Sequence, residues 1–192
     1  MRSKFLVAIT GASGAPYAVA FLRLLKEKEI PVDLIVSEAG EKVVEHETGL
    51  SLKDLRLFAE DLFLAREIAA PPASGSAGYK AMVIIPCTMG TLSAVAHGAA
   101  RNLIHRAADV MLKERRPLVL VVRETPFNLI HLRNMLQAAE AGAVIYPTMP
   151  AFYHRPQSLE EMITFFVQRL ASFLGIGMPE MKRWGSGSYH TI

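Results

Sequence analysis

The chain has 192 residues, of which 51% are hydrophobic and only 20% are charged, and its net charge is +3. This length fits one domain with a full hydrophobic core, and 21 basic against 18 acidic residues is too even a balance to indicate a nucleic-acid-binding protein. The apolar surplus indicates a parallel sheet buried on both faces, subunit interfaces, or both.

Short apolar runs alternate with helical patterns along the chain. We predict five strands, at residues 4–10, 32–37, 81–86, 117–122 and 143–146. Helices are predicted at about residues 16–28, 41–47, 52–64, 92–97, 102–114, 128–141 and 158–174. This alternation predicts an α/β fold with a doubly wound parallel sheet, and five strands suit a flavodoxin-like order. We expect a single domain over residues 1–192, with a C-terminal tail at about residues 175–192 that needs something to hold it.

Cysteine content and hydropathy indicate the compartment. Cys87 is the only cysteine, so the chain cannot form an intramolecular disulfide or a thiolate zinc cluster of its own. Its place at a strand end favours a small core residue over a nucleophile. No apolar run is long enough to span a bilayer, and no signal peptide is recognisable, so we expect a cytoplasmic protein.

The predicted strand exits carry the candidate binding residues, because ligands of open parallel sheets bind at the carboxyl ends of the strands. Four exits end in small, hydroxylic or charged residues: Gly11-Ala12-Ser13-Gly14, Ser37, Thr88-Met89-Gly90-Thr91 and Arg123-Glu124. The first is a candidate phosphate-binding turn, since glycines admit an anion to the backbone at a helix N-terminus; an ordinary turn is the alternative. It lacks the dinucleotide fingerprint, the Walker lysine and the last glycine of a nucleophile elbow.

The charged candidates have two interpretations each. Arg106 and Lys113 lie two turns apart on one predicted helix face, where they could meet a phosphate or simply be solvated. Arg123 and Glu124 follow an apolar strand, as an anion clamp with an adjacent acid or as a surface pair. Glu47 lies in a highly charged helix, so a solvated side chain is the default for it. No histidine pair has metal-ligand spacing, and no Mg²⁺-binding acidic motif is present, so we expect no metal.

Several segments resemble the UbiX-type flavin prenyltransferases. They are TGASG at residues 10–14, APPASGS at 70–76, RAADVMLKERRPLVL at 106–120, RETP at 123–126 and AFYHRPQS at 151–158, with Arg183-Trp184 near the end. The resemblance covers nearly the whole chain, in order. It differs at Cys87-Thr88, where many relatives have Cys-Ser, but threonine keeps the hydroxyl.

The resemblance implies a flavodoxin-like fold that binds reduced FMN and transfers a prenyl group to it from dimethylallyl phosphate. The product, prenylated FMN, would pass to a UbiD-type decarboxylase, and the enzyme would be a homododecamer with sites shared between subunits. The resemblance assigns FMN binding to Gly11, Ala12, Ser13, Ser37, Thr88, Met89, Gly90, Thr91 and Arg123. It assigns binding of the prenyl phosphate to Tyr153 and Arg169.

The catalytic roles that the resemblance implies suit the residue types. Lys113, Arg106 and Arg169 would stabilise the departing phosphate as preorganised charge, and Glu124 would carry a proton to it. Trp184 and Tyr153 would offer aromatic faces to an allyl cation. Ser13 and Glu47 would relay protons as the prenyl unit, bonded to flavin N5, closes onto C6.

Two other functions are compatible with parts of this pattern. One is a flavoprotein that decarboxylates an aromatic acid or a cysteine end, although the cysteine decarboxylases usually carry a P-A-S-A-N-T signature where this chain has residues 72–76. The other is a non-catalytic flavodoxin-like carrier, which has no need of several basic residues around a flavin.

Overall fold

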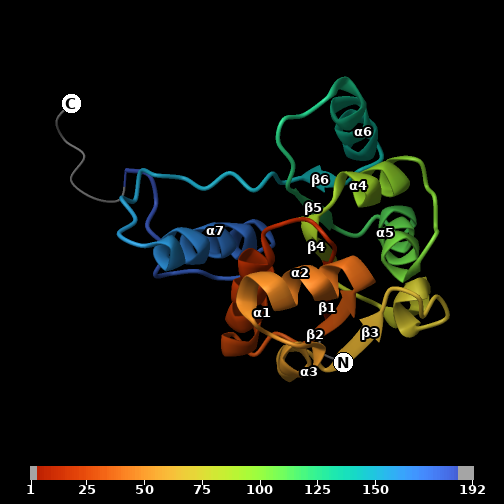
Figure 1. Cartoon of the computed structure of the whole chain (residues 1–192), viewed down its shortest axis with the longest axis horizontal. Coiled ribbons are helices and arrows are strands. Elements are labelled where there is room, and N and C mark those ends of the chain that lie inside the picture. The colour runs from red at the N-terminus through yellow and green to blue at the C-terminus, as the bar shows by residue number, and fades with distance from the viewer. Residues whose placement is uncertain (1–3, 186–192) are drawn as a thin grey trace. The chain divides into compact units, whose positions relative to one another are not determined.

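The structure is a computed structural model that describes residues 4–185. The chain forms two compact units, Met1–Thr148 and Met149–Ile192, and the sheet lies in the first (Figure 1). Residues 186–192 of the predicted tail lie outside the described residues. Among the described helices, none is long and apolar enough to cross a membrane.

Six parallel strands form the sheet in the order β3-β2-β1-β4-β5-β6. The strands are β1 (Phe5–Ile9), β2 (Val32–Val36), β3 (Asp61–Leu64), β4 (Ala81–Cys87), β5 (Leu118–Val122) and β6 (Val144–Ile145). The five predicted strands are confirmed, and without β3 their order is that of a flavodoxin. The additional strand, β3, lies at one side of this arrangement, next to β2.

Helices connect the strands in the order that the alternating pattern predicts. In the first unit they are α1 (Ala15–Glu27), α2 (Glu38–Thr48), α3 (Leu52–Leu55), α4 (Met89–Ala96), α5 (Leu103–Lys113) and α6 (Leu129–Glu140), with 3-10 turns η1 (Arg56–Phe58), η2 (Pro71–Ala73) and η3 (Gly75–Ala77). α4 and α5 pack against one face of the central strands, and α1 contacts β4. Every residue of β1, β2, β4 and β5 is buried, which explains why these strands are apolar without alternation.

The single helix predicted over residues 52–64 is wrong in its second half. The helical stretch ends after Phe58, because Ala59 takes an extended backbone with φ −130° and ψ 154°. The chain then pairs with β2, Asp33 opposite Asp61 and Val36 opposite Leu64. Strand β3 has only four residues and lies at the sheet edge, so pairing with β2 overrides the weak local pattern.

The second unit contains α7 (Leu159–Phe173), which agrees with the helix predicted at about residues 158–174 and has Ser158 as its N-cap. The Ser158 hydroxyl accepts a hydrogen bond from Glu161 N at 3.1 Å. The Glu161 carboxylate reaches back to Gln157 N at 2.7 Å, one residue before the partner that a capping box requires. Ser158 therefore caps α7, while the reciprocal bond to Glu161 is shifted by one residue.

Candidate active site

The exits of β1 and β4 are neighbours at the carboxyl edge of the sheet, where the direction of the chain connections reverses. Thr10 joins them. Its side chain is 3% exposed, and its hydroxyl donates to Pro86 O at 2.6 Å and accepts from Thr88 N at 3.0 Å. This is the point of a doubly wound sheet at which ligands bind. Thr10 therefore fixes two predicted flavin-binding loops to each other, a role that the sequence pattern did not reveal.

Glu47 reaches the N-terminus of α1 from the far end of α2. Its Oε2 accepts from Gly14 N at 2.9 Å and from Ala15 N at 2.8 Å. The default prediction that the Glu47 side chain is simply solvated is therefore wrong. The carboxylate satisfies two of the free amides that every helix start presents, and it occupies the place predicted for a phosphate.

The charge of Glu47 follows from its surroundings. Burial raises its pKa, but hydrogen bonds from the Ser13 side chain and from the amides of Gly14 and Ala15, together with the charge of Arg123, lower the pKa overall. Glu47 is therefore an anion at neutral pH. The same interactions bring Ser13 and Glu47 together, as the resemblance implies.

Two more helices start at this edge with hydroxyl caps. The Ser37 hydroxyl accepts from Gly40 N at 3.0 Å at the start of α2. The Thr88 hydroxyl accepts from Thr91 N at 3.1 Å at the start of α4 and lies 3.0 Å from the Thr91 hydroxyl. Helix N-termini attract anions through free amides and the helix dipole. Glu47 binds the amides at the start of α1. A phosphate at this edge would therefore meet the starts of α2 and α4 instead.

Gly11 and Gly14 of the first loop are each required for a different structural reason. A Cβ on Gly11 would lie 2.5 Å from the Cβ of Ala39, so the loop packs too closely on α2 for any side chain there. Gly14 has φ +117°, a conformation that other residues rarely adopt. Close packing against α2 therefore accounts for Gly11 without a ligand.

Arg123 and Glu124 follow β5 at the same edge. Arg123 N donates to Cys87 O at 3.3 Å, which places it beside the exit of β4. Both side chains are exposed, and Glu124 Oε1 accepts from Thr125 N at 3.0 Å. Cys87 itself is fully buried, and burial raises its pKa to about 12, which makes a thiolate nucleophile unfavourable.

Lys113 lies near the amino ends of the strands, on the side of the sheet opposite the carboxyl edge. It is the last residue of α5, and the following Pro117 O accepts from Met82 N at the amino ends of β4 and β5. β5 has five residues and spans roughly 17 Å at about 3.3 Å per residue. Lys113 and Glu124 of one chain therefore stand at different edges, and Lys113 pairs with Glu114 instead.

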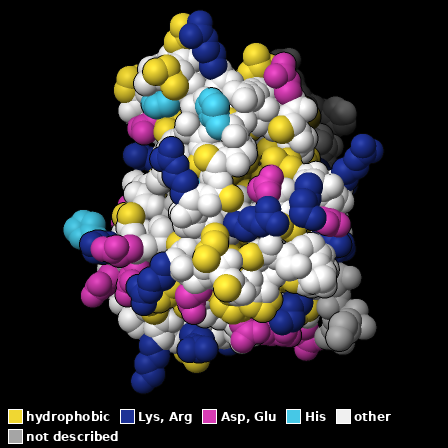
Figure 2. Space-filling view, turned by 90° about the vertical axis from the view of Figure 1, so that its right-hand side faces the viewer, with side chains coloured by type: hydrophobic (Ala, Val, Ile, Leu, Met, Phe, Trp, Pro, Cys, Tyr) yellow, Lys and Arg dark blue, Asp and Glu magenta, His cyan; other side chains and the backbone are white. Residues whose placement is uncertain are grey.

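Other basic residues of this segment hold the loop before β4. Arg106 donates to Ala73 O at 3.1 Å and pairs with Asp109 at 2.7 Å. Arg116 donates to Gly75 O at 3.2 Å. Figure 2 views the side of Figure 1 on which α5 lies, and its basic side chains are interspersed with acidic ones. Within one chain, the solvated interpretation of this basic stretch therefore describes it better than a phosphate pocket.

Three predicted residues lie in the second unit. Tyr153 meets Trp184 edge to face at a centroid distance of 5.5 Å, and Arg169 is exposed on α7. The structure thus brings Tyr153 and Trp184 together. It also shows a neighbour that the sequence analysis did not single out, His154, which is buried beside Tyr153.

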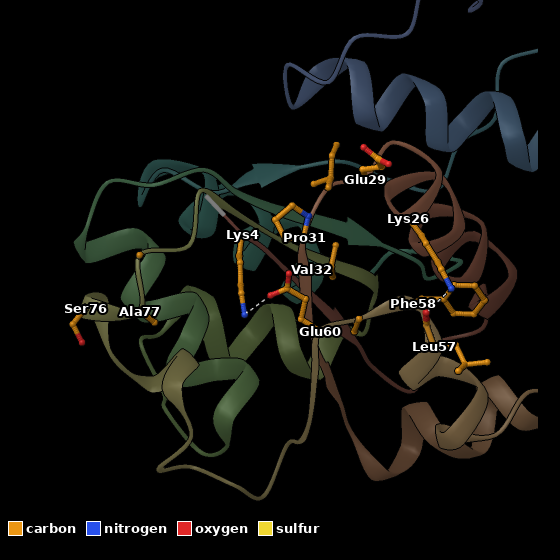
Figure 3. A pocket seen from close by; sticks show the side chains of 13 residues that line it. Lys4, Lys26, Glu29, Pro31, Val32, Leu57, Phe58, Glu60, Ser76 and Ala77 are labelled. Carbon is orange, nitrogen blue, oxygen red and sulfur yellow. Dashed lines mark hydrogen bonds and ion pairs between the residues drawn. The ribbon is translucent and has the colours of Figure 1, made fainter. Parts of the chain in front are cut away.

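A cavity of about 710 Å³ lies away from the predicted site (Figure 3). It opens at the amino ends of β1 and β2, and Lys4, Lys26, Phe58 and Glu60 are among its lining residues. The ammonium of Lys4 is engaged there by Glu60 at 2.7 Å and Asp33 at 3.1 Å. These ion pairs tie the amino ends of the first two strands to the start of β3.

Comparison with known proteins identifies the class to which this fold and site belong. The flavoprotein family profile matches residues 1–171, and the chain is a member of that family. The flavin prenyltransferase UbiX of Pseudomonas aeruginosa is 47% identical over 196 residues, which cover 95% of this chain and 94% of the relative.

Two solved structures are similar over almost their whole length. The crystal structure of AnUbiX (PadA1) in complex with FMN and dimethylallyl pyrophosphate has a TM-score of 0.94 at 40% identity, covering 97% of this chain and 100% of that one. A dodecameric FMN-dependent UbiX-like decarboxylase from Escherichia coli O157:H7 has a TM-score of 0.91 at 40% identity, covering 94% and 98%. Within the flavoproteins, this chain belongs to the UbiX-type flavin prenyltransferases.

Proposed function

We propose that the protein joins the dimethylallyl group of dimethylallyl phosphate to N5 and C6 of reduced FMN, giving prenylated FMN. The observation that supports this best is the anionic Glu47, hydrogen-bonded to Ser13 and to the start of α1, beside Arg123. A fixed carboxylate next to a hydroxyl is suited to move a proton at a ring-closing step.

The carboxyl edge fits FMN by its chemistry. The helix starts capped by Ser37 and Thr88 offer amides to the FMN phosphate, and Arg123 adds a positive charge. Gly11, Ala12, Ser13, Met89, Gly90 and Thr91 belong to the loops that would surround the cofactor. Bound reduced FMN supplies the electron-rich ring to which the prenyl group is joined.

Departure of the phosphate from the prenyl donor requires positive groups that hold the phosphate and an acid that delivers a proton to it. We assign Lys113, Arg106 and Arg169 to the departing phosphate, with Tyr153 as a further contact, and Glu124 as proton carrier. Trp184 and Tyr153 offer ring faces to the cationic prenyl group. The similar AnUbiX structure contains dimethylallyl pyrophosphate, so the diphosphate is the second donor to test.

A second copy of the chain would complete this site, because Lys113 stands at the amino edge of its own sheet. The α6 helix offers a surface for such contacts, since several large apolar side chains are exposed on it: Leu129 59%, Ile130 65%, Leu132 49% and Leu136 61%. Contiguous exposed apolar side chains are typical of interaction surfaces. We propose that α6 lies between copies in a homododecamer.

The mass of the flavin product tests the function. Purified protein is mixed anaerobically with reduced FMN and either dimethylallyl phosphate or dimethylallyl diphosphate, and the flavin is analysed by mass spectrometry. We expect a flavin heavier by one prenyl unit. Carbon dioxide from an aromatic acid or a peptide's cysteine end, without a new flavin, would instead establish a decarboxylase. Tightly bound but unchanged FMN would establish a carrier.

The client and the compartment are part of the same proposal. Prenylated FMN is expected to activate a UbiD-type decarboxylase, which can be tested by adding the reaction mixture to an apo-decarboxylase and measuring carbon dioxide. The free thiol of Cys87 suits a reducing, cytoplasmic location.

A further inference from the structure

Three rings surround Tyr153 in the second unit. Its ring meets those of His154, Phe165 and Trp184 edge to face, at centroid distances of 5.9, 5.4 and 5.5 Å. Such pairs are attractive because the positive edge of one ring meets the negative face of the other. We call these four rings the aromatic cluster; together they define the orientation of Tyr153.

His154 is a buried member of the aromatic cluster. It is 9% exposed, and its ring stacks on that of Phe165 with a centroid distance of 3.9 Å and an interplanar angle of 19°. Among the described residues, neither of its ring nitrogens has a hydrogen-bond partner, and both are shielded from solvent. A neutral imidazole packs there as an aromatic ring, whereas an imidazolium would be a buried charge with two unsatisfied donors.

The surrounding charges reinforce the neutral form. Burial lowers the pKa of His154, the charge of Lys182 in the tail lowers it further, and Glu161 at the start of α7 opposes these effects in part. His154 therefore stays neutral at pH values where an ordinary histidine gains a proton.

We propose that His154 is a pH-sensitive positioning residue, which in its neutral form fixes Tyr153 and, through it, Trp184 for binding of the prenyl donor. This inference rests on the proposed function, in which Tyr153 contacts the prenyl phosphate. His154 itself need not touch the donor, because it acts through the ring of its neighbour.

The direction of the pH effect follows from proton binding. Because the unfolded or loosened chain takes up a proton on His154 more readily than the packed cluster does, acid favours the loosened form. The packed cluster is fully favoured above the ordinary histidine pKa of about 6.5. It loses that advantage as the pH falls from there toward the lower pKa of the packed state.

The test compares His154→Phe and His154→Ala with the wild-type protein in the prenylation assay. Phenylalanine preserves stacking and cannot take a proton, while alanine removes both ring contacts. We expect His154→Ala to raise the KM for dimethylallyl phosphate about tenfold, with the Kd for FMN unchanged. His154→Phe is expected to keep the wild-type KM at pH 8.

Acidification separates a titrating residue from a merely structural one. The donor's own phosphate titrates near pH 6, but it does so equally for every variant, so the ratio of wild-type KM to His154→Phe KM is measured. We expect this ratio to rise as the pH falls below about 6.5. His97→Phe, which changes an exposed histidine, is the matched control. The ratio of wild-type KM to His97→Phe KM should stay constant as the pH falls.

Trp184 is the only tryptophan, so its fluorescence reports on the cluster without any prenylation. His154→Ala should shift its emission to the red, and His154→Phe should not. An unchanged KM and emission in His154→Ala would overturn the positioning role, and a pH-independent ratio would overturn its pH sensitivity. If wild-type protein makes no prenylated flavin, the proposed function fails, while the emission still decides whether His154 positions the cluster.

Discussion

At the carboxyl edge of the sheet, the loops after β1 and β4 are joined within one chain by the Thr10 hydroxyl, and Glu47 fixes the first loop to α2. The groups assigned to the prenyl phosphate are not gathered in this way: Lys113 pairs with its neighbour Glu114 at the amino edge. The loops predicted to bind flavin are therefore held together within a single chain. In the function that we propose, the phosphate side is completed by a second copy of the chain.

Subunit mixing gives the largest expected effect. We expect Lys113→Ala and Glu124→Gln each to bind FMN normally but to lose prenyl transfer by roughly 100-fold or more, because each removes a charge or proton needed for phosphate departure. If Lys113 serves a neighbour's site, oligomers assembled from both variants contain some intact sites. Turnover should then reappear on mixing after dissociation and reassembly.

The matched control for this mixing is Lys53→Ala, which removes an exposed lysine at the start of α3. It should retain turnover alone. Absence of any recovery in reassembled Lys113→Ala and Glu124→Gln oligomers would place both residues in the same chain's site or outside the chemistry. Loss of FMN binding in either variant would contradict its assigned role.

Glu47→Gln tests the flavin side. Glutamine can still accept from Gly14 N and Ala15 N but carries no charge, so we expect turnover to fall by about 100-fold with FMN retained. The lowered pKa of Glu47 means that its ionised form stabilises the fold above the unfolded pKa of about 4.3, and that this contribution is lost as the pH falls further. The difference in melting temperature between wild type and Glu47→Gln should therefore shrink below that pH; a constant difference would argue against an ionised Glu47.

The link between the loops predicts a smaller effect on binding. Thr10→Val keeps the shape of the side chain but leaves Thr88 N without its partner, at a cost of about 1–3 kcal/mol. Part of this cost should appear as FMN affinity that is weaker by about tenfold, measured by flavin fluorescence. Thr10→Ser retains the hydroxyl and should bind like wild type. Equal affinity in all three proteins would show that the loops hold their positions without this bond.

Sequence patterns predicted the strand exits correctly because buried parallel strands are short, continuous apolar runs, which here end in small, hydroxylic or charged residues. They failed for β3, whose four residues are defined by pairing with β2 rather than by their own pattern. The residues alone also left Glu47 as a solvated side chain. Its partners Gly14 and Ala15 lie more than thirty positions earlier in the chain, so only the packing of α2 beside α1 reveals them.

Thr10 and His154 were missed for a related reason. A threonine at the end of a strand is ordinary in composition, and its importance depends on Pro86 and Thr88 of a neighbouring strand exit. His154 was passed over because it lacks metal-ligand spacing, while its burial depends on stacking against Phe165 of α7. Local sequence therefore located the strand exits, whereas contacts between distant segments decide which side chains meet there.

The first loop itself offers the finest test, because Gly11 is explained by packing rather than by ligand contact. Gly11→Ala would place a Cβ 2.5 Å from the Cβ of Ala39, and overpacking of this kind costs about 1–3 kcal/mol of unfolding free energy. Ala39→Gly removes the opposing methyl group, so the double variant should regain the stability lost through the clash, apart from the cost of a glycine within the first turn of α2. A double-mutant cycle from denaturant unfolding measures this coupling. If the double variant is stable but still binds FMN poorly, the backbone at Gly11 must approach the cofactor closely, and the glycine serves the ligand as well as the helix.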